Sequence, residues 1–98
     1  MKIIEVSTGE YLVNIGVEFD STENWSALDY LIEEEQIKSL TFDFENTMYV
    51  NSSAFGYTVN ISQVLASKGA TLKLINLCQK VSMVFKCLGG YELLNIED

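Results

Sequence analysis

Two adjacent serines carry the most specific chemical signal in this 98-residue sequence. Asn51, Ser52 and Ser53 follow a short apolar run and precede a helical pattern, so they stand where a helix begins. One interpretation is structural, because side-chain oxygens at this position accept hydrogen bonds from free backbone N–H groups. The other is regulatory, because a phosphate on a serine there lies where the helix dipole favours negative charge.

Most catalytic chemistries lack their usual residues in this chain. The sequence contains no histidine, no arginine and no proline, which excludes the Ser-His-Asp triad and histidine-ligated zinc. No glycine-rich phosphate-binding motif occurs, since Gly89-Gly90 is too sparse for one. We therefore expect that the protein is not an enzyme and needs no cofactor or metal.

The acidic residues and the cysteines are weak candidates for a site. On a helix, Glu33-Glu34-Glu35 would diverge by about 100° per residue and would not converge on one ion. Asp43 and Glu45 share one face of an expected strand and could bind a hard cation, although two ligands make a poor site. No histidine is available to activate Cys78 or Cys87, so we interpret both as buried small residues, not as a disulfide.

The charge of the chain is strongly acidic and unevenly distributed. The net charge is −8, and residues 1–50 hold eleven acids and two lysines, whereas residues 51–98 hold three acids and four lysines. We therefore expect one acidic end and no nucleic-acid binding. No apolar stretch approaches the roughly 18 residues of a membrane span, so we expect no membrane insertion. Glu5 comes too early for a signal peptide. Two cysteines without a disulfide framework favour a protein of the reducing cytoplasm.

The hydrophobic periodicity predicts an opening hairpin followed by alternating strands and helices. The expected strands are Ile3–Val6, Tyr11–Ile15, Leu40–Phe44, Leu72–Leu77 and Tyr91–Ile96, and the expected helices are residues 20–37, Ser53–Lys68 and Gln79–Leu88. Asp20 or Ser21 is the N-cap candidate of the first helix, with Glu23 placed for a capping box. Crossover helices imply a single α/β domain over residues 1–98, with a mixed, mainly parallel sheet and an N-terminal antiparallel hairpin.

The middle helix has a wider apolar surface than packing on a sheet requires. Its main apolar face consists of Ala54, Tyr57, Thr58, Ile61, Val64 and Leu65. Phe55, Val59 and Ala66 form an adjoining flank. Either this flank packs against a neighbouring helix, or it is a partly exposed patch for a partner protein.

The segment Asn51–Gly56 resembles the Asp-Ser-Ser-Gly-Leu-Gly signature of STAS domains, the family of anti-sigma factor antagonists. Four further segments are similar to this family in the same order along the chain. Ile15–Asp20 resembles its G-x-L-D turn, and Leu40–Phe44 its vvlDls strand. Lys68–Leu74 resembles its G-g-x-l-x-l passage, and Val81–Gly89 its third helix with the terminal glycine. The resemblance covers nearly the whole chain.

The resemblance implies a non-catalytic STAS-like domain with helices mainly on one face of the sheet. It implies a bacterial signalling protein that regulates transcription by capturing an anti-sigma factor, itself a serine kinase of the histidine-kinase-like ATPase type. A phosphatase is a further partner that it allows. Ser53 is the implied phosphorylation site, and its phosphorylation is implied to weaken partner binding. The implied partner-binding residues are Asn51, Ser52, Ser53, Phe55, Val59, Gly16, Glu18 and Asp20.

Two positions depart from the family signature. Asn51 replaces its aspartate, which keeps a capping oxygen but removes the carboxylate beside the acceptor hydroxyl, so phosphorylation of Ser53 remains open. Ala54 replaces a glycine and favours the helix by about 1 kcal/mol. Other STAS domains of similar size imply an alternative function, a structural subunit that braces the ATPase of a lipid-transport ABC complex.

Overall fold

A computed structural model describes residues 1–20 and 25–97 of the chain, in which strands and helices alternate after an opening hairpin. The strands are β1 (Lys2–Ser7), β2 (Glu10–Asn14), β3 (Glu18–Phe19), β4 (Ser39–Asp43), β5 (Tyr49–Val50), β6 (Thr71–Ile75) and β7 (Asn95–Glu97). The helices are α1 (Ser26–Ile32), α2 (Ser52–Ser67), α3 (Gln79–Cys87) and α4 (Gly90–Leu93).

Five of these strands form one sheet in the order β1-β2-β4-β6-β7. β1 pairs antiparallel with β2, and the other neighbours in this sheet pair parallel. This arrangement confirms the predicted mixed, mainly parallel sheet with an N-terminal hairpin. β3 and β5, which the sequence pattern did not predict as a pair, form a separate two-stranded parallel ribbon.

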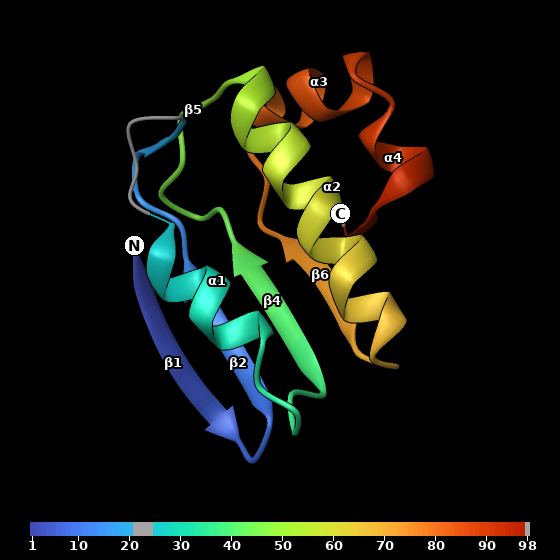
Figure 1. Cartoon of the computed structure of the whole chain (residues 1–98). Helices are drawn as coiled ribbons and strands as arrows, with labels where there is room; N and C mark the ends of the chain where they lie inside the picture. Colours follow the sequence, from blue (N-terminus) through green and yellow to red (C-terminus); the bar gives the residue numbers. More distant parts are fainter. Residues whose placement is uncertain (21–24, 98) are drawn as a thin grey trace.

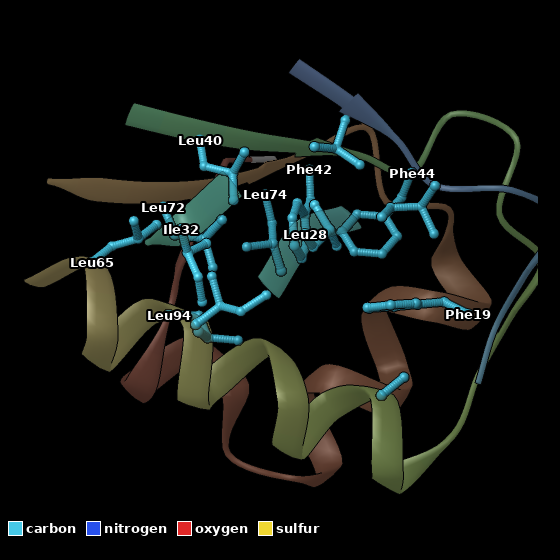
Figure 2. Packing of buried hydrophobic residues seen from close by; sticks show 14 of the residues in the cluster. Phe19, Leu28, Ile32, Leu40, Phe42, Phe44, Leu65, Leu72, Leu74 and Leu94 are labelled. Atoms are coloured by element: carbon cyan, nitrogen blue, oxygen red, sulfur yellow. The ribbon is translucent and has the colours of Figure 1, made fainter. Parts of the chain in front are cut away.

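The hydrophobic core lies between the sheet and the helices, which cover one of its faces (Figures 1 and 2). The strand register aligns Val13, Phe42 and Leu74 in one row, and all three side chains are fully buried. Leu28 of α1 and Leu65 of α2 close the core from the helical side. The alternation of each strand therefore turns one apolar row inward, as half-buried sheets require.

α2 agrees with the predicted helix to within one residue at each end. It buries Ala54, Thr58, Ile61 and Leu65 of its predicted apolar face. Gly69 follows the helix with φ of +75°, the left-handed conformation in which glycine ends helices without strain. None of the helices among the described residues is long and apolar enough to cross a membrane.

The first helix is shorter than its apolar spacing predicted. α1 ends at Ile32, so Glu33–Glu35 lie beyond it, and Ile37 is buried from the connection to β4. Ile37 matched the apolar spacing of the helix by coincidence, because it is buried for a different reason, as part of the connection. The described N-cap of α1 is Trp25, not Asp20, while Ser21 and Glu23 lie outside the described residues.

The end of the chain also differs from the prediction. The sequence suggested a strand over Tyr91–Ile96, but residues 90–93 form α4 and only Asn95–Glu97 pairs with β6. A side chain at Gly90 would meet the ring of Phe55 and the carbonyl of Phe85 at 2.9 Å. Because Gly90 has no side chain, its backbone packs closely on these residues at the start of α4. This contact joins distant residues, so a local sequence pattern does not reveal the helical turn.

Candidate functional site

Ser52 and Ser53 lie in the first turn of α2, and both residues are exposed. The N-cap is Asn51, whose Oδ1 accepts a hydrogen bond from the backbone N–H of Ala54 at 2.9 Å. This confirms the capping interpretation for Asn51. Because the asparagine supplies the cap, the two serines are left at the surface, where an enzyme or a partner can reach them.

The ribbon of β3 and β5 holds the Gly16–Asp20 segment beside the start of α2. The backbone N–H of Met48 donates to Val17 O at 2.8 Å, and that of Asn51 donates to Phe19 O at 3.2 Å. Glu18 pairs with Tyr49 in the same ribbon. The structure thus brings the sequence-predicted residues of this segment next to those of the serine motif, about 30 positions later in the chain.

Thr47 holds this arrangement in place through hydrogen bonds, although no sequence pattern pointed to it. Its hydroxyl is fully buried and donates to the carbonyls of Ile15 at 3.1 Å and Gly16 at 2.8 Å. The carbonyl of Thr47 accepts a hydrogen bond from the Cys78 Sγ at 3.6 Å. A single threonine after a turn carries no periodic pattern, so only its tertiary contacts identify this role.

Three large apolar side chains are exposed on the ribbon next to the serines. Val17, Met48 and Tyr49 keep 60%, 55% and 48% of their surface exposed, and we call them the β3–β5 patch. The backbone N–H groups of Met48 and Tyr49 both donate to Val17 O, so the backbones of these three residues are neighbours. Grouped exposed apolar side chains are typical of a surface that binds another protein. The short apolar run Met48–Val50 was the signal available in the sequence.

The two remaining sequence-predicted partner residues, Phe55 and Val59, are half-buried. The ring of Phe55 packs edge-on against Phe85 of α3, with ring centroids 5.6 Å apart. Val59 packs against the core. Phe55 and Val59 of the apolar flank therefore pack partly within the domain, and Ala66, its third member, is exposed.

An aromatic pair connects α1 to α2 one helical turn after Ser53. The rings of Trp25 and Tyr57 stack with centroids 4.1 Å apart, and Trp25 also meets Phe19 of β3 at 5.8 Å. The Tyr57 hydroxyl donates to Asp29 Oδ1 at 2.7 Å. Burial, and then this hydrogen bond, raise the pKa of Tyr57 above its ordinary value, so the phenol stays protonated.

The acidic residues and the cysteines were also weighed from the sequence as site residues, and they have structural roles or none. Asp43 Oδ1 accepts hydrogen bonds from Glu45 N at 2.9 Å and Asn76 Nδ2 at 3.0 Å, which links the ends of β4 and β6. Within residues 1–20 and 25–97, no three His, Cys, Asp or Glu side chains gather as a metal site would need. Both cysteines are free thiols; Cys78 is half-buried and Cys87 is exposed. The prediction of two buried cysteines is therefore wrong for Cys87, because α3 turns Val81 and Phe85 inward instead.

No family model and no curated protein matches the chain. Among solved structures, the unphosphorylated anti-sigma factor antagonist SpoIIAA superposes with a TM-score of 0.83 at 16% identity, covering 99% of this chain and 87% of that one. The phosphorylated SpoIIAA of Bacillus, a cell fate determinant, superposes with a TM-score of 0.76 at 15% identity. This match covers 99% of this chain and 90% of that one. A sulfate transporter family protein from Wolinella succinogenes has a TM-score of 0.70 at 14% identity, covering 96% and 76%.

These likenesses extend over nearly the whole chain at low sequence identity, so they establish the fold. The fold implied by the sequence resemblance is confirmed: this chain has the STAS fold of the anti-sigma factor antagonist SpoIIAA.

Proposed function

We propose that this chain is a non-catalytic binding module of the anti-sigma factor antagonist type. It captures a protein partner at the start of α2 and releases that partner when Ser53 is phosphorylated. The observation that carries this proposal is the pair of exposed serines beside the exposed β3–β5 patch. The fold shared with SpoIIAA, a protein solved in unphosphorylated and phosphorylated forms, supports it.

The proposed partner is an anti-sigma factor that is also a serine kinase of the histidine-kinase-like ATPase type, in the cytoplasm of a bacterium. A phosphatase would restore the free hydroxyl. The partner surface consists of Asn51, Ser52, Ser53, Gly16, Glu18, Asp20 and the β3–β5 patch, with the exposed parts of Phe55 and Val59. Backbone pairing between β3 and β5 supports this grouping, since it joins the two segments.

The switch acts by charge. A phosphoserine carries about −1.5 to −2 charges at pH 7. At the N-terminus of α2 this charge favours the fold by roughly 0.3–1 kcal/mol, so the domain keeps its shape. A partner matched to a neutral hydroxyl and apolar neighbours must instead desolvate a dianion, which costs affinity.

The proposal is tested with the immobilised chain and a lysate of the source organism. The native chain and Ser53→Ala are expected to capture an ATPase of the stated type, while Ser53→Asp is expected to lose it. Ser67→Asp is the matched control, because it places the same charge at the exposed far end of the same helix. Equal capture by Ser53→Asp and the native chain would contradict the charge mechanism.

A second step tests the modification itself. The captured ATPase, purified and supplied with ATP, should place phosphate on Ser53, which peptide mass spectrometry locates. Phosphate that appears only after Asn51→Asp would show that the native chain binds constitutively. Capture of a transport-complex ATPase, without phosphorylation, would instead favour the structural-subunit alternative.

A further inference from the structure

The two adjacent glycines between α3 and α4 meet different requirements. Gly89 has φ of +81°, a left-handed conformation that residues with a side chain rarely adopt. Gly90 is the first residue of α4 and has no positive φ, so other residues can also adopt its backbone conformation. The surroundings of Gly90, and not its conformation, therefore require a glycine at this position.

The surroundings of Gly90 are two phenylalanines from different helices. Gly90 is buried, and a Cβ atom there would stand 2.9 Å from Phe55 Cε1 and 2.9 Å from the carbonyl oxygen of Phe85. The rings of Phe55 and Phe85 pack edge-on, with centroids 5.6 Å apart. The edge of the Phe55 ring therefore occupies space that a side chain at position 90 would need.

Phe55 connects this contact to the serine site. It is the largest side chain in the first turn of α2 and follows Ser53 by two residues. Its backbone N–H donates to Asn51 O at 3.1 Å, the hydrogen bond that begins the helix. The ring is half-buried, so its exposed part belongs to the proposed partner surface. The position of this ring therefore affects both the turn that carries Ser53 and the surface beside it.

α3 contacts the same site at its other end. Its N-cap, Cys78, donates from Sγ to Thr47 O at 3.6 Å, and Thr47 directly precedes the Met48–Tyr49 part of the β3–β5 patch. Figure 1 shows α3 beside the first turns of α2. The segment from Cys78 to Gly90 thus contacts the candidate site at both of its ends.

We propose that Gly90 is a positioning residue for the partner surface. By leaving space for the Phe55 ring, it determines how the first turn of α2 presents Ser53 and how much of the ring a partner meets. This role rests on the proposed function, which assigns Phe55 to the partner surface. A side chain at position 90 should displace the ring and, with it, the backbone of residues 52–56, because an overfilled core shifts side chains and backbone together.

The packing step is tested without a partner, by NMR of the isotope-labelled full chain. Gly90→Ala is compared in two backgrounds, the native chain and Phe55→Leu, because leucine lacks the ring edge that the new Cβ would meet. In the native background, Gly90→Ala should shift the amide signals of residues 52–56 and speed their hydrogen exchange. In the Phe55→Leu background, the same substitution should leave those signals nearly unchanged. The contact with the Phe85 carbonyl is common to both backgrounds, so the comparison isolates the ring.

Glu92→Ala is the matched control, because it places an alanine at an exposed residue of the same helix. It should leave the signals of residues 52–56 unchanged. Equal shifts in both backgrounds, or no shift in the native background, would overturn the proposal. If Gly90→Ala does not fold but the double variant does, the ring is the obstacle, as proposed. If neither folds, the Phe85 carbonyl is the obstacle and the proposal is wrong.

The ATPase captured by the native chain provides the binding readout. Its Kd should rise about threefold or more for Gly90→Ala, and the same substitution should change it less than about twofold in the Phe55→Leu background. An unchanged Kd for Gly90→Ala would contradict the positioning role alone. Failure of the native chain to capture an ATPase would instead contradict the proposed function, so the two failures are distinguishable.

Discussion

Thr47 and Asn51 hold the candidate site together by hydrogen bonds to backbone atoms. Thr47 connects the turn after β4 to the Gly16 segment, and Asn51 caps α2 directly before the serines. Thr47 is not part of the proposed partner surface, whereas Asn51 also belongs to that surface. Both side chains determine the position of the Ser53 hydroxyl relative to the β3–β5 patch.

Removing the Thr47 hydroxyl should destabilise the domain. Thr47→Val keeps the shape of the side chain but leaves the buried carbonyls of Ile15 and Gly16 without this donor. Urea unfolding should show a loss of about 1–3 kcal/mol in the free energy of unfolding. Thr71→Val, at an exposed position of β6, is the control and should change it by less than about 0.5 kcal/mol. Equal effects would show that the Thr47 hydrogen bonds contribute no net stability.

Tyr57 should make the fold sensitive to alkaline pH. Burial and the hydrogen bond to Asp29 raise the pKa of Tyr57 in the native state. The unfolded chain ionises near the ordinary tyrosine value of about 10, while the native state keeps the proton. The stabilisation is therefore complete below about pH 10 and is lost as the pH rises above it.

The measurement is urea unfolding of the native chain and Tyr57→Phe on both sides of this pH. The Phe variant cannot ionise at position 57 and should lose less stability in alkali than the native chain. Tyr11, whose pKa is also raised, is present in both proteins, so the comparison isolates Tyr57. The same alkaline loss in both proteins would contradict the assignment.

At the scale of secondary-structure elements, two glycines in helices have opposite roles. Gly56 lies inside α2 with open space where a Cβ would stand. Gly90 starts α4, and a Cβ there would come within 2.9 Å of both the Phe55 ring and the Phe85 carbonyl. At Gly56, helix propensity alone determines the effect of an added side chain on stability. At Gly90, the packing between α2, α3 and α4 determines it.

These environments predict opposite effects for one substitution. Gly56→Ala should raise the free energy of unfolding by up to about 1 kcal/mol, the propensity difference in a helix interior. Gly90→Ala should lower it by about 1–3 kcal/mol, because the rings of Phe55 and Phe85 must move. Thermal and urea unfolding check both values. A neutral Gly90→Ala would show that α4 is packed loosely against α3.

At the scale of the whole molecule, the uneven distribution of charge should make stability depend on salt. The acidic residues of the first half of the chain repel one another, and Glu33–Glu35 lie exposed after α1. Raising the ionic strength from about 0.01 to about 0.15 M shortens the Debye length from about 30 to about 8 Å. The melting temperature should therefore rise with added salt, because screening reduces this repulsion.

Replacing the three glutamates by glutamine should raise the melting temperature at low salt and flatten its salt dependence. Glu92→Gln, at an exposed acid in the nearly neutral second half of the chain, is the control and should change the dependence little. Melting curves at several sodium chloride concentrations provide the measurement. A native melting temperature that does not vary with salt would show that the separated charges do not affect stability.

The sequence by itself determined the features that depend on neighbouring residues. The opening hairpin, the boundaries of α2, the Asn51 cap and the exposed serines all follow from periodicity and capping within a few positions. Because five short segments resemble the STAS signature in the same order, the fold could be predicted from the sequence as well.

Only the tertiary structure decided the features made by distant segments. The Thr47 hydrogen bonds and the pairing of Val17 with Met48 join residues about 30 positions apart, and Gly90 packs on Phe55 from a different helix. No local period records such contacts, because they depend on how strands and helices meet after collapse. For the same reason the extent of α1, the helical turn of α4 and the exposure of Cys87 differed from the sequence pattern. The sequence therefore contained the apolar run Met48–Val50, but only the folded chain brings Val17 next to it.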